Sequence, residues 1–151
     1  MWLGQGFTGS EPWRLYWVLS MVRWGAGQRA IAELTQAETL ERDDSITPIL
    51  LDHELARTGK RAKAARNLEN VLAKSHGESI PDCYPAAVWT AIGDKREALH
   101  FLERAYHFRS NWIVYLQYDP RFDGLRSAPQ FKALLHHQVA FPPSDSLAMQ
   151  R

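Results

Sequence analysis

The chain has 151 residues, of which 45% are hydrophobic and 23% are charged, with a formal net charge of +1 and one cysteine. This length is enough for one domain to bury a core. The small net charge excludes a global field that would favour nucleic acid or an anionic membrane, and a single cysteine excludes an internal disulfide framework. We therefore expect a cytoplasmic protein with no nucleic-acid or membrane partner.

Helix-start and helix-stop signals divide the chain into short helices. The Gly-rich residues 1–10 indicate a flexible lead-in, and glycine turns or polar turns separate the segments that follow. Expected helices lie at about 12–24, 28–40, 46–57, 61–74, 82–92 and 95–108. Towards the C-terminus we expect a short apolar helix over 111–118, a compact turn, a final helix over about 128–138 and a disordered tail over 142–151.

A four-position pattern recurs three times at a spacing of 34 residues. A turn glycine is followed by an alanine, then by a leucine, and then by a further apolar residue, and on a helix these last three share one face. Recurrence at this period predicts stacked helix pairs, because one pair cannot bury its own apolar faces. The positions are Gly25, Ala30, Leu34 and Ala37, then Gly59, Ala64, Leu68 and Val71, then Gly93, Ala98, Leu102 and Ala105.

The pattern resembles the tetratricopeptide repeat, which has a period of about 34 residues and these small and large apolar positions. The resemblance implies an all-α, right-handed α-solenoid of antiparallel helix pairs. It implies a helical repeat domain over 11–141, in which repeats at about 11–44, 45–78 and 79–110 precede a cap at 111–141. The repeats are degenerate, since the small residue of each first helix is Val18, Asp52 and Ala86.

The segment Asp119–Phe131, with the sequence DPRFDGLRSAPQF, resembles the tail that closes many bacterial tetratricopeptide regions. Such regions are often fused to winged-helix transcription regulators, class III nucleotide cyclases or Ser/Thr kinases, where the tail acts as a capping element. The resemblance implies a signalling role. One alternative is therefore that this chain is the C-terminal sensory or regulatory region of a bacterial transcription regulator or nucleotide cyclase.

In tetratricopeptide proteins the first helix of each pair lines a concave groove. Some members clamp the C-terminal carboxylate of a peptide there with Asn and Lys, and neither residue type occurs at the matching positions. The implied groove is apolar with an Arg and His edge, which suits a helix or an extended apolar segment. Its partner-binding positions are Leu19, Arg23, His53, Arg57 and Thr90, beside Cys83, Ala87 and Ala91.

The expected first helix is apolar around nearly its whole circumference, and Trp13, Trp17 and Trp24 all lie on it. A helix of this kind is normally buried on all sides, whereas a terminal repeat needs a polar outer face. We hypothesise an interface at these tryptophans, through which the chain self-associates or binds a partner.

The sequence contains no visible catalytic or metal-binding constellation. His136 and His137 point about 100° apart on a helix, so the pair alone cannot chelate a metal well. Cys83 has no marked histidine partner, and turn chemistry before proline and glycine explains Asp119 and Asp123. We therefore expect no metal, no cofactor and no enzymatic activity, and we interpret the chain as a protein–protein interaction adaptor or scaffold.

Overall fold

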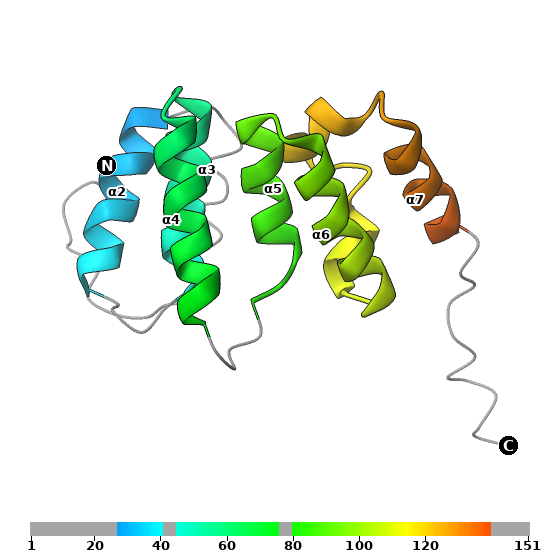
Figure 1. Cartoon of the computed structure of the whole chain (residues 1–151), viewed down its shortest axis with the longest axis horizontal. Coiled ribbons are helices and arrows are strands. Elements are labelled where there is room, and N and C mark those ends of the chain that lie inside the picture. The colour runs from blue at the N-terminus through cyan, green and yellow to red at the C-terminus, as the bar shows by residue number, and fades with distance from the viewer. Residues whose placement is uncertain (1–26, 41–44, 76–79, 140–151) are drawn as a thin grey trace, which may run out of the picture.

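The computed structural model describes residues 27–40, 45–75 and 80–139, and all regular structure in these ranges is helical (Figure 1). The expected all-α class is confirmed. The expected first helix, the lead-in over 1–10 and the tail over 142–151 lie outside the described residues. The elements are α2 (Gly27–Leu40), α3 (Ile46–Arg57), α4 (Arg61–Lys74), α5 (Cys83–Ile92), α6 (Lys95–His107), the 3₁₀ helices η1 (Asn111–Tyr115) and η2 (Pro120–Leu125), and α7 (Pro129–Val139).

The helix bounds agree with the sequence prediction because the signals that start and stop them are local. α3 and α4 begin and end at the expected residues, α2, α5 and α6 differ by one residue at one end, and α7 begins and ends one residue later than expected. Pro85 is the third residue of α5. Within the first turn its missing N–H removes no helical hydrogen bond, so the proline is tolerated there.

Glycine ends α3 and α5 in the same way. Gly59 and Gly93 have φ angles of +94° and +97°, in the left-handed region. At α3 the amide of Lys60 then donates to the Leu55 carbonyl at 2.8 Å, and α5 ends with the equivalent bond at 3.0 Å. These bonds satisfy carbonyl groups that the helix itself leaves unpaired, and glycine adopts the required conformation without a Cβ clash.

The repeated alanine and leucine positions are buried throughout. All six of these side chains on α2, α4 and α6 are at most 1% exposed. Alanine permits the two helices of a pair to approach closely, and leucine fills the space beside it. They are Ala30 and Leu34, Ala64 and Leu68, and Ala98 and Leu102.

Helices that are neighbours in sequence are also neighbours in space. α3 packs on α2 and α4, and α5 packs on α3, α4 and α6, so the helices form a row in chain order (Figure 1). A hydrophobic cluster around Leu68 includes side chains of α2 to α5, and a second cluster around Phe122 includes side chains of α5, α6, η2 and α7. Because α5 belongs to both clusters, the core continues along the row.

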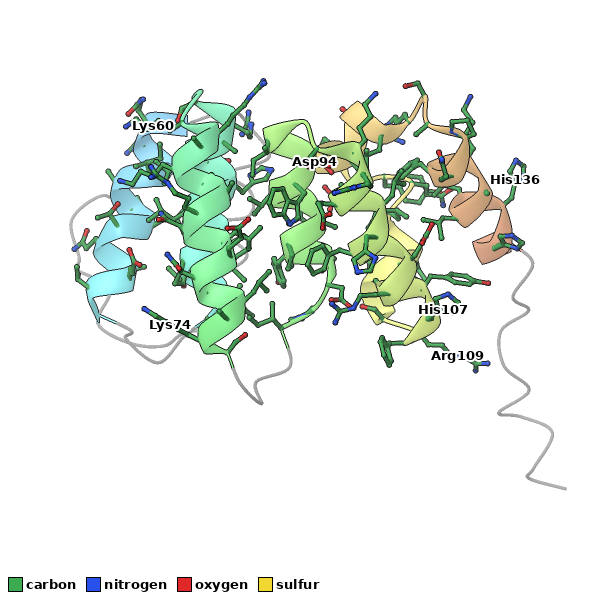
Figure 2. The ribbon with its side chains drawn as sticks, viewed as in Figure 1. Lys60, Lys74, Asp94, His107, Arg109 and His136 are labelled. Atoms are coloured by element: carbon green, nitrogen blue, oxygen red, sulfur yellow. The ribbon has the colours of Figure 1, made fainter. Side chains whose placement is uncertain are left out.

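The connections between helices lie at two opposite edges of the row. Lys60 and Asp94, which directly follow the two glycine turns, lie at one edge, and Lys74, His107 and Arg109 lie at the other (Figure 2). This alternation is that of antiparallel helices joined by short turns. The two faces of the row between these edges are therefore formed by the sides of the helices.

The expected short apolar helix over 111–118 forms over fewer residues and is a 3₁₀ helix. Asn111–Tyr115 forms a 3₁₀ helix, and the Leu116 amide donates to the Ile113 carbonyl at 3.2 Å. Ile113 and Leu116 both pack against the second cluster. A 3₁₀ helix has three residues per turn and therefore aligns these two side chains, so burial against α6 decides the local geometry.

The expected compact turn after residue 118 is confirmed as η2. The Asp119 carboxylate accepts a hydrogen bond from the Arg121 amide at 3.0 Å and so caps this short helix. Phe122 and Leu125 are at most 2% exposed and join the core between α5, α6 and α7. The cap therefore covers one face of α5 as well as the end of the row.

Candidate functional site

A depression of about 360 Å³ lies between α3, α5 and η2, and we name it the groove pocket. Its walls come from segments that are far apart in sequence and that meet because the cap folds back over α5. The residues that line it are His53 and Arg57 of α3, Thr90 and Ala91 of α5, and Pro120, Arg121, Asp123 and Gly124 of η2.

The structure brings three of the candidate partner-binding residues together. His53, Arg57 and Thr90 all line the groove pocket, and so does the neighbouring groove position Ala91. Two other groove positions, Cys83 and Ala87, are instead buried in the hydrophobic core. The cap packs over that part of α5, so only the end of α5 near the glycine turn contributes to the depression.

Sequence reasoning missed the contribution of the cap to this site. Local turn chemistry accounts for the DPRFDG segment, and nothing in that pattern indicates that Arg121 faces α3. Tertiary packing brings Arg121 to the pocket, because η2 docks on α5 through buried Phe122. The remaining candidate residues, Leu19, Arg23, Trp13, Trp17 and Trp24, lie outside the described residues.

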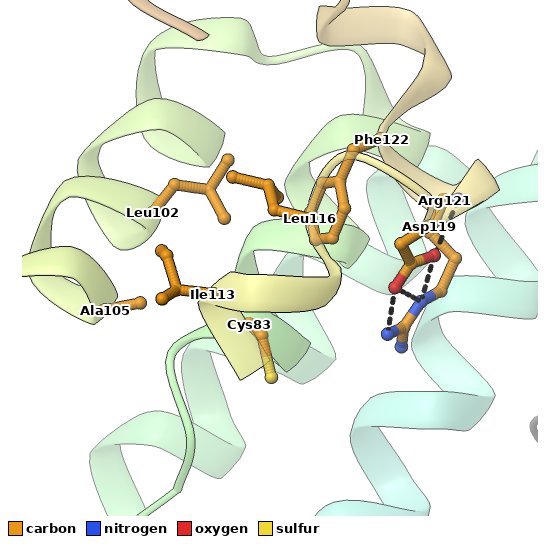
Figure 3. Close-up of a pocket in the computed structure, with 8 residues that line it drawn as sticks. All are labelled: Cys83, Leu102, Ala105, Ile113, Leu116, Asp119, Arg121 and Phe122. Carbon is orange, nitrogen blue, oxygen red and sulfur yellow. Dashed lines mark hydrogen bonds and ion pairs between the residues drawn. The ribbon is translucent and has the colours of Figure 1, made fainter. Parts of the chain in front are cut away.

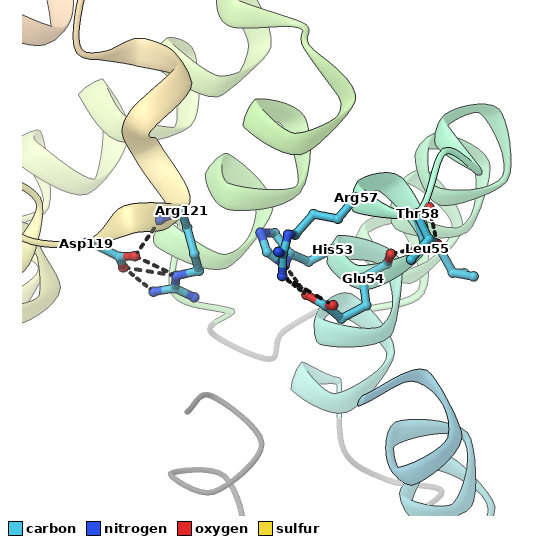
Figure 4. Close-up of polar contacts among 7 residues, drawn as sticks. All are labelled: His53, Glu54, Leu55, Arg57, Thr58, Asp119 and Arg121. Carbon is cyan, nitrogen blue, oxygen red and sulfur yellow. Dashed lines mark hydrogen bonds and ion pairs between the residues drawn. The ribbon is translucent and has the colours of Figure 1, made fainter. Parts of the chain in front are cut away.

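A buried carboxylate organises the α3 wall of the pocket (Figure 4). Glu54 is 0% exposed, and its Oε1 lies 3.0 Å from His53 Nδ1 and 3.1 Å from Arg57 Nη1. Burial lowers the pKa of His53, and the nearby guanidinium groups of Arg121 and Arg57 act in the same direction, against the hydrogen bond and charge of Glu54. His53 is therefore neutral at pH 7.

An ion pair within the cap forms the opposite wall. Arg121 Nε lies 3.0 and 2.9 Å from the two oxygens of Asp119, and Nη2 donates to the same carboxylate. Burial would raise the pKa of Asp119, but the hydrogen bonds and charge of Arg121 outweigh it and hold that pKa below its usual range. The guanidinium also lies 5.9 Å from the ring centroids of Tyr84 and Phe122, contacts that help to fix its position.

A second cavity, of about 10 Å³, lies where η1 covers α5 and α6 (Figure 3). This is about the size of one water molecule. Cys83 lines it together with Ile113 and Leu116. Burial raises the pKa of the Cys83 thiol to about 11, so the thiolate needed for nucleophilic attack is scarce at neutral pH. Cys83 is therefore a core side chain in this fold.

Within the described ranges, no group of three or more His, Cys, Asp or Glu side chains could hold a metal ion. His136 and His137 are exposed near the end of α7 and are not part of the groove pocket. Among the helices of the described residues, none is both long and apolar enough to span a membrane. The groove pocket offers hydrogen-bond donors and acceptors beside small apolar surfaces, an arrangement suited to binding.

Comparison with known proteins identified no relative. The chain matches no protein-family model, no curated protein and no solved structure. Function is therefore inferred from the groove pocket and from the repeat pattern.

Proposed function

We propose that this chain is a non-catalytic protein–protein interaction module, an adaptor or scaffold that binds a peptide or helical segment of a partner protein. The site is the groove pocket. The observation that carries the proposal is that His53, Arg57 and Thr90, three positions that the tetratricopeptide resemblance assigns to a groove, line one depression.

The proposal takes the helices as a right-handed solenoid of degenerate tetratricopeptide-like repeats. Three observations support it. Left-handed Gly59 and Gly93 end the first helix of two successive pairs, the repeated Ala and Leu positions are buried, and each helix packs on its neighbours in chain order. In such a solenoid the first helices of neighbouring pairs share one face. Here those helices are α3 and α5, and the groove pocket lies between them.

The size and lining of the groove pocket support binding of a chain segment. A volume of about 360 Å³ is within the ~300–1,000 Å³ range typical of ligand sites. Ala91, Pro120 and Gly124 supply small apolar surfaces, while polar side chains stand at the α3 and η2 walls. Apolar atoms of a partner segment can pack on the small apolar surfaces, while its hydrogen-bonding groups bind the polar side chains of the two walls.

The test is selection of ligands from a phage library of random dodecapeptides, followed by calorimetric titration of the recovered peptides. Gly124→Leu is the blocking variant, because a Cβ at this position meets only Thr90 Cγ2, at 3.5 Å, and the side chain would extend into the pocket lining. Gln130→Leu, at an exposed site on α7, adds the same side chain away from the pocket.

We expect the recovered peptides to bind wild type and Gln130→Leu equally and to bind Gly124→Leu more weakly by about tenfold or more, equivalent to about 1.4 kcal/mol. Circular dichroism of both variants checks that the helices are retained. A library that yields no specific peptide, or peptides that bind Gly124→Leu as tightly as wild type, would overturn the proposal.

A further inference from the structure

The hydrogen-bonding state of His53 is determined by its partner. An ionised carboxylate accepts hydrogen bonds and cannot donate them, and the Glu54 carboxylate also accepts from Arg57 Nη1 at 3.1 Å. The 3.0 Å contact between Glu54 Oε1 and His53 Nδ1 therefore places a proton on Nδ1. Because the ring is neutral, Nε2 carries no proton and is a hydrogen-bond acceptor.

Two groups on facing walls of the groove pocket are left for a ligand. No described residue bonds His53 Nε2, although His53 lines the pocket. Arg121 uses Nε and Nη2 to bind Asp119, which leaves Nη1 as a donor without a partner among the described residues. Asp119 holds one side of the guanidinium and His53 lies across the pocket from it (Figure 4). The site thus presents one acceptor opposite one donor.

Among the residues that the structure describes, each arginine at or beside the groove pocket pairs with a carboxylate. Arg57 pairs with Glu54, Arg121 pairs with Asp119, and Arg126 pairs with Asp123 at 2.6 Å. A charged ligand group would lose water on entry without gaining a net countercharge, which is unfavourable. A carboxylate would also face the bare lone pair of His53 Nε2. A neutral group that both donates and accepts avoids both costs.

We propose that the groove pocket takes the side-chain carboxamide of an Asn or Gln residue in the bound partner segment. The amide nitrogen donates to His53 Nε2, and the amide oxygen accepts from Arg121 Nη1. This inference rests on the proposed function, because it names the chemistry that the same pocket recognises.

The first test reads the His53 ring directly in the wild-type protein without a ligand. Long-range ¹H–¹⁵N NMR distinguishes a protonated ring nitrogen from a bare one. At pH 7 we expect Nδ1 to carry the proton and Nε2 to be bare. A ring protonated on Nε2 or on both nitrogens would overturn the proposal, because the acceptor would then be missing.

The second test titrates wild-type protein with propanamide, a mimic of the Gln side chain, and with propanoate and 1-propanol. Backbone amide shifts of Thr90, Ala91 and Gly124 report occupancy. We expect saturable shifts with propanamide, weaker binding of the other two probes by about tenfold, and loss of the propanamide shifts in Gly124→Leu but not in Gln130→Leu. Equal or tighter binding of propanoate, with proton uptake at His53, would assign the pocket to a carboxylate and overturn the proposal. Absence of any saturable shift would also overturn it.

The peptides selected above separate this inference from the proposed function. Their Asn or Gln residues are replaced by Glu or by Met, and we expect either change to weaken binding by about tenfold. Peptides that bind the pocket with no Asn or Gln would leave the interaction function standing and overturn the carboxamide inference. If propanamide binds but the library yields no specific peptide, the carboxamide site is supported and the proposed binding of a partner segment is overturned.

Discussion

The Asn67 side chain donates from Nδ2 to Asp52 Oδ1 at 3.1 Å, which joins α4 to a carboxyl group buried on α3. Asp52 is 1% exposed, and its second oxygen, Oδ2, has no hydrogen-bond partner among the described residues. Burial raises the pKa of Asp52 to about 7, assisted by the charge of Glu38 and opposed by Asn67 and Lys63. The fold thus holds a carboxyl group that gains or loses its proton near neutral pH.

The contribution of Asp52 to stability should therefore fall as the pH rises from 5 to 8. The native state keeps a proton on Asp52 that the unfolded chain loses near pH 3.8, so the stabilisation is complete below that value and is lost as the pH rises through about 7. Asp52→Asn removes this titration. The difference in unfolding free energy between variant and wild type should change by about 2–3 kcal/mol between pH 5 and pH 8, in favour of the variant at pH 8. Urea unfolding at several pH values measures it, and a difference that does not depend on pH would contradict the raised pKa.

Arg109 occupies, after α6, the place that glycine occupies after α3 and α5. Its φ is +51°, and the Ser110 amide donates back to the Ala105 carbonyl at 2.9 Å. A left-handed conformation costs a residue with a Cβ about 1–2 kcal/mol. Arg109→Gly should raise the unfolding free energy by about 0.5–1 kcal/mol, measured by chemical denaturation. A loss of stability would mean that the Arg109 side chain contributes more than the backbone strain costs.

The two turn glycines should show the opposite effect. A Cβ added at Gly59 or Gly93 would meet no atom within 4 Å, so any cost arises from the left-handed backbone alone. Gly59→Ala and Gly93→Ala should each lower the unfolding free energy by about 1–2 kcal/mol. Thermal denaturation followed by circular dichroism measures the loss, and an unchanged melting temperature would show that the turn relaxes to another conformation.

The cap should contribute to stability through Phe122. This side chain is 2% exposed between α5, α6 and α7, whereas Phe108 is 77% exposed. Phe122→Ala should cost about 3–5 kcal/mol, because it removes a buried ring and leaves a cavity. Phe108→Ala is the matched control and should change stability by no more than about 0.5 kcal/mol. Similar effects of the two substitutions would show that the cap does not fold with the helix row.

Cys83 should react slowly with thiol reagents in the native protein. Its side chain is buried and its pKa is raised to about 11, so at pH 8 both access and the thiolate fraction are low. The rate of reaction with Ellman's reagent should rise by orders of magnitude, ~10²-fold or more, when guanidinium chloride unfolds the chain. Rapid reaction under native conditions would indicate that η1 opens over α5.

The sequence alone determined the α-helices of the described residues, because their signals are local. Turn glycines, the proline in a first turn and the 34-residue recurrence of Ala and Leu predicted helix bounds to within one residue and predicted which positions are buried. The resemblance to the tetratricopeptide repeat assigned His53, Arg57 and Thr90 to a groove, and these three residues line the groove pocket. The helix bounds depend on residues that lie within a few turns of one another.

Only the tertiary structure decided how the groove pocket is completed. Arg121 is 64 residues beyond Arg57 in sequence, and the two line one pocket because Phe122 and Leu125 dock η2 against the core. The cap also buries Cys83 and Ala87, and packing of η1 against α6 makes it a 3₁₀ helix that is shorter than the helix expected from the sequence. Such contacts depend on burial between distant segments, and no local pattern encodes them.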